Sequence, residues 1–151
     1  MPFRDIVGHH HVLALLRRGV ARRSLPPALL LAGPSGVGKR AMAGALAQAL
    51  NCSTPVGTDD AIDACGECLS CRRIAKGVHP DVVVVEPGEN GSIKIEQVRD
   101  VIDRAQYRPF EGRVRVVIID QADAAGDDAQ SALLKTLEEP PSRSEEHTSE
   151  L

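Results

Sequence analysis

The chain has 151 residues, of which 42% are hydrophobic and 26% charged, and its net charge is −3. This length suffices for one domain with a hydrophobic core, and the composition is that of an ordinary globular protein. The net charge argues against wholesale wrapping of nucleic acid, and no apolar run approaches the ~20 residues needed to span a bilayer. The N-terminus also lacks a signal-peptide core, so we expect a cytoplasmic protein without membrane contact.

Helices and strands are predicted to alternate along the chain. Apolar residues at helical spacing predict helices at about His9–Arg23, Ala41–Leu50, Ser70–Lys76, Ile95–Ala105 and Asp127–Glu138. Apolar runs, one of them with four consecutive valines, predict strands at Ala28–Ala32, Asp81–Glu86 and Val114–Ile119. The segment 51–78 is rich in Gly, Asp and Cys, so we expect mostly loop there. Strands that alternate with helices indicate an α/β fold with a parallel sheet.

A glycine-rich motif follows the first predicted strand and opens the next helix. Its residues are Gly33, Pro34, Ser35, Gly36, Val37, Gly38 and Lys39. This is the spacing of a phosphate-binding loop, in which backbone N–H groups, the helix dipole and the lysine charge hold phosphate oxygens. Nucleoside triphosphatases follow this lysine with Ser or Thr, whose hydroxyl binds Mg²⁺, whereas this chain has Arg40. We therefore predict a loop that binds phosphates but does not organise Mg²⁺ for hydrolysis; a glycine-rich turn without a ligand is the alternative.

The third predicted strand ends at Asp120, in the position where ligands bind to open α/β sheets. An aspartate there can hold Mg²⁺ through water. The next residue is usually a glutamate that activates the attacking water, but here it is Gln121, which takes up no proton at neutral pH. Arg40 and Gln121 are thus two independent losses that indicate a binding-only site or a relic, although Asp120 alone could be a solvated strand end.

All four cysteines fall in the loop-rich segment 51–78. They are Cys52, Cys65, Cys68 and Cys71. On a knuckle-like turn the last three thiolates can converge, and Cys52 completes a tetrahedron, which favours a structural zinc (Zn²⁺) site. Disulfides are the competing interpretation, although they are rare in the cytosol. Redox chemistry is disfavoured because these cysteines do not open a helix after a strand.

The order of these parts resembles the bacterial clamp-loader subunits of the AAA+ superfamily. The matching segments are Phe3–Gly8, Gly33–Lys39, Asn51-Cys52, the three-cysteine knuckle, Tyr107–Pro109, the strand to Asp120 and Ala132–Pro141. The resemblance covers nearly everything from Phe3 to Ser142. It implies a P-loop AAA+ parallel sheet flanked by helices, an inserted zinc module at about 51–78, and nucleotide contacts from Val7 and Gly8. It also implies a machine that opens the sliding clamp and loads it on primed DNA, with the clamp-loader subunits gamma/tau and delta as partners.

Within this family, Arg40, Gln121 and the segments His79–Asp81 and Ile93–Arg99 resemble the stator subunit more than the ATP-hydrolysing motor subunit gamma/tau. The motor keeps Thr after the loop lysine and Glu after the strand aspartate. The resemblance therefore implies a non-catalytic subunit of a DNA polymerase holoenzyme, with ATP bound but not hydrolysed. A motor subunit with unusual motifs is the alternative within the family. A P-loop kinase-like enzyme with a zinc lid would need a Mg²⁺ hydroxyl ligand and an acceptor pocket that the sequence does not show. A nucleic-acid-binding zinc module would need a basic–aromatic surface.

The residues Arg143–Leu151 break from the preceding pattern and resemble the translation of a sequencing-library adapter, with a native acidic linker as the alternative. We therefore expect residues 1–142 to be the N-terminal part of an AAA+ domain. The AAA+ arrangement further implies a strand, encoded beyond Pro141, between the strands predicted at 28–32 and 114–119. Without that strand, we expect unpaired backbone groups along both of its neighbours.

Overall fold

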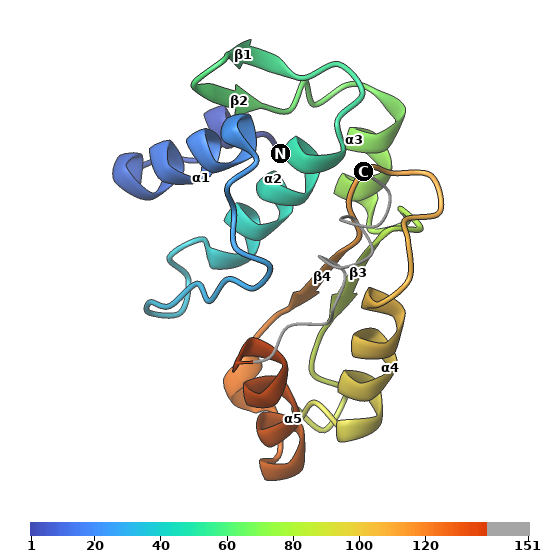
Figure 1. The fold of residues 1–151 in the computed structure, drawn as a ribbon. Helices are drawn as coiled ribbons and strands as arrows, with labels where there is room; N and C mark the ends of the chain where they lie inside the picture. Colours follow the sequence, from blue (N-terminus) through green and yellow to red (C-terminus); the bar gives the residue numbers. More distant parts are fainter. Residues whose placement is uncertain (139–151) are drawn as a thin grey trace.

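The computed structural model describes residues 1–138, so the tail predicted to be non-native lies outside the described residues (Figure 1). The elements in chain order are η1 (Phe3–Asp5), α1 (His10–Arg22), α2 (Lys39–Asn51), β1 (Val56–Thr58), β2 (Ala61–Asp63), α3 (Leu69–Lys76), β3 (Val82–Val85), α4 (Ile95–Ala105), β4 (Val116–Ile119), η2 (Ala122–Ala124) and α5 (Asp127–Glu138). All five predicted helices are confirmed, with boundaries within a few residues of those expected. Within residues 1–138, no helix combines the length and the apolar character that crossing a membrane would require.

A pair of parallel strands forms the centre of the fold. β3 and β4 pair in register, from Val82 with Val116 to Val85 with Ile119. Their side chains alternate between two cores: Val82 and Ile118 pack with α2 and α3, whereas Val85 and Ile119 pack with α4 and α5. Figure 1 shows these helix pairs on opposite sides of the strands. Burial on both faces explains why both strands are continuous β-branched runs, and the predicted α/β fold is confirmed.

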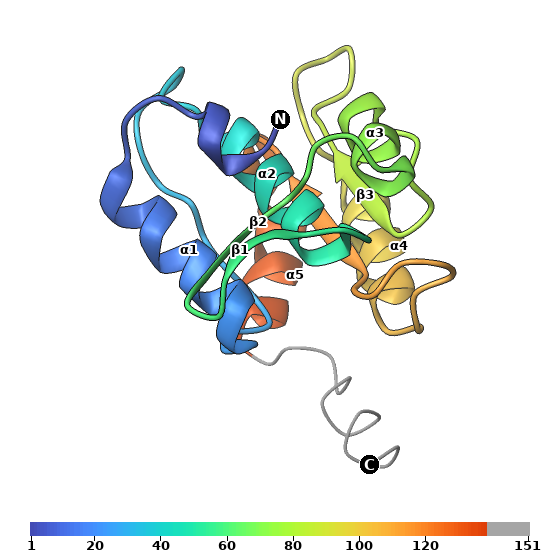
Figure 2. The same cartoon turned by 90° about the horizontal axis from the view of Figure 1, so that it is seen from above.

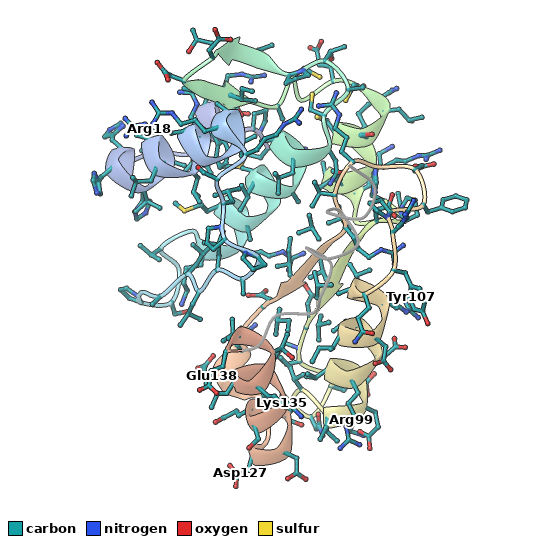
Figure 3. All side chains as sticks on the ribbon, in the orientation of Figure 1. Arg18, Arg99, Tyr107, Asp127, Lys135 and Glu138 are labelled. Carbon is teal, nitrogen blue, oxygen red and sulfur yellow. The ribbon has the colours of Figure 1, made fainter. Side chains whose placement is uncertain are left out.

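The N-terminal helices form a further core beside the strands. Its buried residues come from η1, α1 and α2 and are Phe3, Leu13, Leu16, Met42, Ala45, Leu46 and Ala49. Phe3 is buried here, whereas the other two aromatic residues of the chain are exposed on the loop that follows α4. Tyr107 projects from this loop into solvent (Figure 3). The cores therefore depend almost wholly on aliphatic side chains.

A short antiparallel hairpin, β1 with β2, occupies part of the segment that the sequence predicts to be loop. β2 contacts both α1 and α2, and the hairpin lies across these helices (Figure 2). Gly57 has φ 129°, and a Cβ at this residue would lie 2.1 Å from the carbonyl oxygen of Ala61. Each strand has three residues, which is too few for alternation to be recognised in the sequence.

The strand predicted at Ala28–Ala32 is not formed. Residues 24–38 contain neither helix nor strand. Leu31 packs against the N-terminal core, but the side chain of Leu30 is 73% exposed. Among the described residues β4 has a single neighbour, β3, so no strand lies between β4 and this segment. A strand persists where its backbone N–H and C=O groups pair with a neighbour, and a run of leucines does not supply that partner.

A buried carboxylate fixes the loop that precedes β4. Asp81 is fully buried and accepts hydrogen bonds from the backbone N–H groups of Phe110, Glu111 and Gly112. The guanidinium of Arg115 lies 3.4 Å from the same carboxylate. Burial opposes ionisation of Asp81, but the three backbone hydrogen bonds and the arginine charge outweigh it and lower the pKa of this carboxyl.

Replacing Asp81 by Asn should release this loop. The amide keeps the size of the side chain but offers one neutral acceptor oxygen, so the N–H groups of residues 110–112 lose their charged partner. Hydrogen bonds to charged groups contribute about 1.5–3 kcal/mol, so amide exchange at these residues should accelerate by about tenfold or more. Asp123→Asn, at an exposed position, is the control.

The pH dependence of this anchor has a definite sign. Because the folded-state pKa of Asp81 lies below its usual value of about 3.9, the anchor is complete above that pH and weakens as the pH falls below it. Unchanged exchange rates in Asp81→Asn at neutral pH would contradict this role.

Candidate functional site

Four cysteine thiols converge at the end of α2. Cys52 follows α2, Cys65 and Cys68 lie on the turn before α3, and Cys71 is in the first turn of α3. All four Sγ atoms lie within 4.8 Å of one another, and those of Cys52 and Cys68 are 3.9 Å apart. Tetrahedral zinc with Zn–S bonds of about 2.3 Å requires sulfurs about 3.8 Å apart. The four cysteines are free of disulfides, and their spacing fits the predicted zinc ion.

Backbone N–H groups point at these sulfurs. Cys65 Sγ accepts hydrogen bonds from Glu67 N and Cys68 N at 3.3 and 3.2 Å. Cys68 Sγ accepts one from Cys71 N at 3.5 Å. Gly66, with φ 82°, provides the turn that directs the N–H groups inward. Such donors stabilise thiolates, which are the form that coordinates a metal.

The protonation of the thiols depends on their surroundings. Burial raises the pKa of Cys52 and Cys71. At Cys68, hydrogen bonds from the hydroxyl and backbone of Ser53 and from the backbone of Cys71 outweigh burial and lower the pKa to about 5. The buried thiols therefore need a cation to ionise, which is the charge that zinc supplies when bound.

A buried aspartate attaches this module to the N-terminal segment. Asp63, at the end of β2, accepts hydrogen bonds from Phe3 N, Arg4 N and Arg4 Nη1 at 2.9, 3.1 and 3.2 Å. The Arg4 guanidinium also donates to the carbonyl oxygens of Ala64 and Cys65 at 2.7 and 2.8 Å. The sequence does not predict this role for Asp63, because its partners lie about 60 positions away along the chain.

The predicted phosphate-binding motif forms a loop that leads into α2. Gly36 and Gly38 have φ 83° and 103°, a backbone conformation that residues with a Cβ rarely adopt. Lys39 Nζ donates to the carbonyl oxygen of Gly33 at 2.6 Å, so the two ends of the loop are joined. Phosphate-binding loops combine such a loop with a helix N-terminus and a lysine ammonium group. Nucleotide binding by these residues stays a prediction.

Arg40 bridges the carboxyl ends of both parallel strands. Its Nη1 atom lies 2.7 Å from Glu86 Oε1 and 3.2 Å from Asp120 Oδ2. Glu86 and Asp120 directly follow β3 and β4, so they occupy the next position of the same register. The hydrogen bond to Glu86 is the main cause that raises the pKa of Arg40, so the guanidinium stays charged. The sequence predicts Asp120 as a site residue but not Glu86. The feature that could have indicated Glu86 is its position directly after the four valines, at the end of the predicted strand.

The remaining predicted residues lie beside this loop or directly after β4. His9 Nε2 is 2.9 Å from the carbonyl oxygen of Val37. This contact holds the preceding segment, Val7–Gly8, next to the phosphate loop. The side chain of Val7 is almost fully exposed. Gln121 follows Asp120 with φ 54° and lies directly before η2. The sequence predicts only that a helix starts at about His9 and gives no signal for its contact with the loop.

We expect one zinc ion per chain, bound by the four cysteines. Replacing Cys68 by Ser removes one thiolate and should abolish stoichiometric zinc in protein purified without chelators, as measured by metal analysis. Structural zinc contributes about 10 kcal/mol or more of binding free energy, so residues 51–78 should also become protease-sensitive. Ser70→Ala, on the same helix α3, should keep its zinc. An unmodified protein without zinc would show that the cluster holds another ion or none.

Comparison with known proteins identifies relatives of this chain. A family model described as "DNA polymerase III, delta subunit" matches residues 8–145. DNA polymerase III subunit tau of Escherichia coli is 39% identical over 139 residues, which are 92% of this chain and 21% of that protein. Subunit gamma of Buchnera aphidicola subsp. Acyrthosiphon pisum is 35% identical over 139 residues, which are 92% of this chain and 37% of that protein. Subunit delta' of Pseudomonas aeruginosa is 44% identical over 114 residues, which are 75% of this chain and 34% of that protein.

The chain thus spans between about a fifth and two fifths of these relatives. Gamma and tau subunits match a larger share of this chain than delta' does. The comparisons therefore support the motor alternative, gamma/tau, better than the expected stator, delta'. The family model covers far more than half of the chain. The chain therefore belongs to the clamp-loader family of DNA polymerase III, which comprises the gamma, tau and delta' subunits, and corresponds to their N-terminal region.

Proposed function

We propose that this chain works as part of a clamp-loader subunit in DNA replication and helps to load the sliding clamp onto primed DNA. Family membership carries this proposal. Its partners would be the other clamp-loader subunits, gamma/tau and delta, together with the clamp and the DNA, and its location would be the cytoplasm. Co-purification of the full-length protein with these subunits tests the proposal, and a protein that joins no such complex would refute it.

We further propose that its nucleotide site binds ATP without hydrolysing it. The observation that carries this is the engagement of Asp120 by Arg40, at the two positions that would otherwise hold Mg²⁺. The nucleotide would contact Val7, Gly8 and the residues from Gly33 to Arg40, with Asp120 at the edge of the site. Gln121 adds a second defect, because an amide cannot accept the proton of an attacking water.

Two subunit identities fit parts of this picture. The share of the chain that is matched, 92% for tau against 75% for delta', together with the four-cysteine cluster, favours a gamma/tau subunit. Arg40 and Gln121 favour delta', since the resemblance assigns intact hydrolysis motifs to the motor. Measured hydrolysis separates the two, because a motor must turn over ATP at this site.

The purified full-length protein, alone or with DNA, should show no ATPase activity above background. Arg40→Thr and Gln121→Glu together should restore measurable turnover in the assembled complex, because they return both a metal ligand and a base. Neither change alone should restore turnover. A general base typically accelerates a reaction 10²–10⁴-fold, but only when the attacking nucleophile is already positioned. The control is Arg22→Thr. Arg22 lies on helix α1, away from this site, and the change breaks only its exposed ion pair with Asp60. Robust turnover by the unmodified protein would favour the motor subunit.

A further inference from the structure

Two carboxylates meet at the edge of the parallel strands, and one nitrogen atom contacts both. Glu86 and Asp120 follow strands that pair in register, and the hydrogen bond from Asp120 N to Val85 O, at 2.9 Å, continues the ladder to this point. Their negative charges therefore lie close together and repel unless a cation lies between them. Arg40 Nη1 donates to Glu86 Oε1 at 2.7 Å and to Asp120 Oδ2 at 3.2 Å.

The residues present do not fit a bound divalent metal. Mg²⁺ requires oxygen ligands at about 2.0–2.1 Å in octahedral geometry. The position that would provide a hydroxyl carries Arg40, which has only N–H donors and a charge that is permanent in proteins. A metal ion at Asp120 would face this guanidinium directly, and both carboxylates already accept its hydrogen bonds. The arginine fills the role of the cation in charge and in position.

We infer that the guanidinium of Arg40 is the resident cation of this site, so that the site excludes divalent metal and binds nucleoside di- or triphosphates without Mg²⁺. The part that concerns nucleotides rests on the nucleotide binding proposed above, whereas the exclusion of metal rests on the ion pairs alone. Lys39 and Arg40 are consecutive, so the phosphates would meet two fixed positive charges at the start of α2, one of them shared with the carboxylates.

The same ion pairs join three elements. Arg40 lies in the first turn of α2, Glu86 follows β3, and Asp120 follows β4. All three side chains are partly exposed, and exposed pairs are worth only about 0–1 kcal/mol each. Substitution of Arg40 should therefore leave the fold intact, which makes the inference testable with folded variants.

The first test uses Mn²⁺ alone with the full-length protein. Electron paramagnetic resonance measures the free Mn²⁺, and the number of bound ions follows by difference from the total. The measurement compares the unmodified protein, Arg40→Thr and the control Arg22→Thr. We expect no Mn²⁺ at this site in the unmodified protein or the control, and one additional ion in Arg40→Thr. Adding Asp120→Asn to Arg40→Thr should remove that ion, which would locate it. Equal Mn²⁺ binding with and without Arg40, lost on Asp120→Asn, would overturn the inference.

The second test measures the affinity for a fluorescent ADP analogue in Mg²⁺ and in EDTA. The Kd of the unmodified protein should differ by less than about twofold between Mg²⁺ and EDTA. Arg40→Thr should bind about tenfold or more weakly in EDTA than in Mg²⁺, a ratio that corresponds to about 1.4 kcal/mol. Arg40→Lys keeps the charge without the planar fork and should remain metal-independent but bind more weakly. A tenfold loss in EDTA by the unmodified protein would overturn the inference. Absence of binding in every variant would refute the proposed nucleotide site, while the Mn²⁺ counts would still decide whether Arg40 excludes metal.

Discussion

Glu86 and Asp120 lie next to each other because β3 and β4 pair in register along their whole length. Parallel strands that are buried on both faces cannot slide by one residue without turning valines from one helix layer to the other. The register is therefore fixed by the two cores, and it delivers two carboxylates to one edge of the sheet. That edge is also where α2 begins, so the residue after the loop lysine must accommodate both charges. An arginine at this position satisfies the constraint without a metal.

Helix α2 connects this edge to the cysteine cluster. Its first turn carries Lys39 and Arg40, and its last residue, Asn51, is followed directly by Cys52. Thirteen residues at about 1.5 Å each separate the two sites by about 20 Å. Asn51 Oδ1 also accepts hydrogen bonds from Arg113 N and Val114 N, which ties the end of α2 to the chain that enters β4. The helix is thus held at one end by the strand edge and at the other by the cysteine cluster and the β4 entry.

The parts that could be predicted from the sequence are those whose physical cause is local. Four valines in a row, helical spacing in α4, and the interval of three between Cys65, Cys68 and Cys71 each constrain neighbouring residues. The structure confirms the elements and the cluster that they predict. The parts that could not be predicted join distant residues. Asp63 meets the N-terminal segment and Glu86 meets Arg40 only after folding, and neither contact leaves a periodic signal. The expected stator subunit follows from Arg40, Gln121 and two short segments, His79–Asp81 and Ile93–Arg99, whereas the overall similarity supports gamma/tau better.

The segment before the phosphate loop shows how far a strand depends on its neighbours. Ala28–Ala32 is as apolar as β3, yet it forms no strand, while β3 does so with β4 as partner. The AAA+ arrangement implies a strand between this segment and β4, and residues 1–138 supply none. Without a strand to lead into it, the loop is positioned from α2, through the bond from Lys39 to Gly33, and from the start of α1, through the contact of His9 with Val37. The loop conformation is therefore set by its own glycines, by α2 and by the start of α1. A strand before the loop would form only where a neighbouring strand pairs with it.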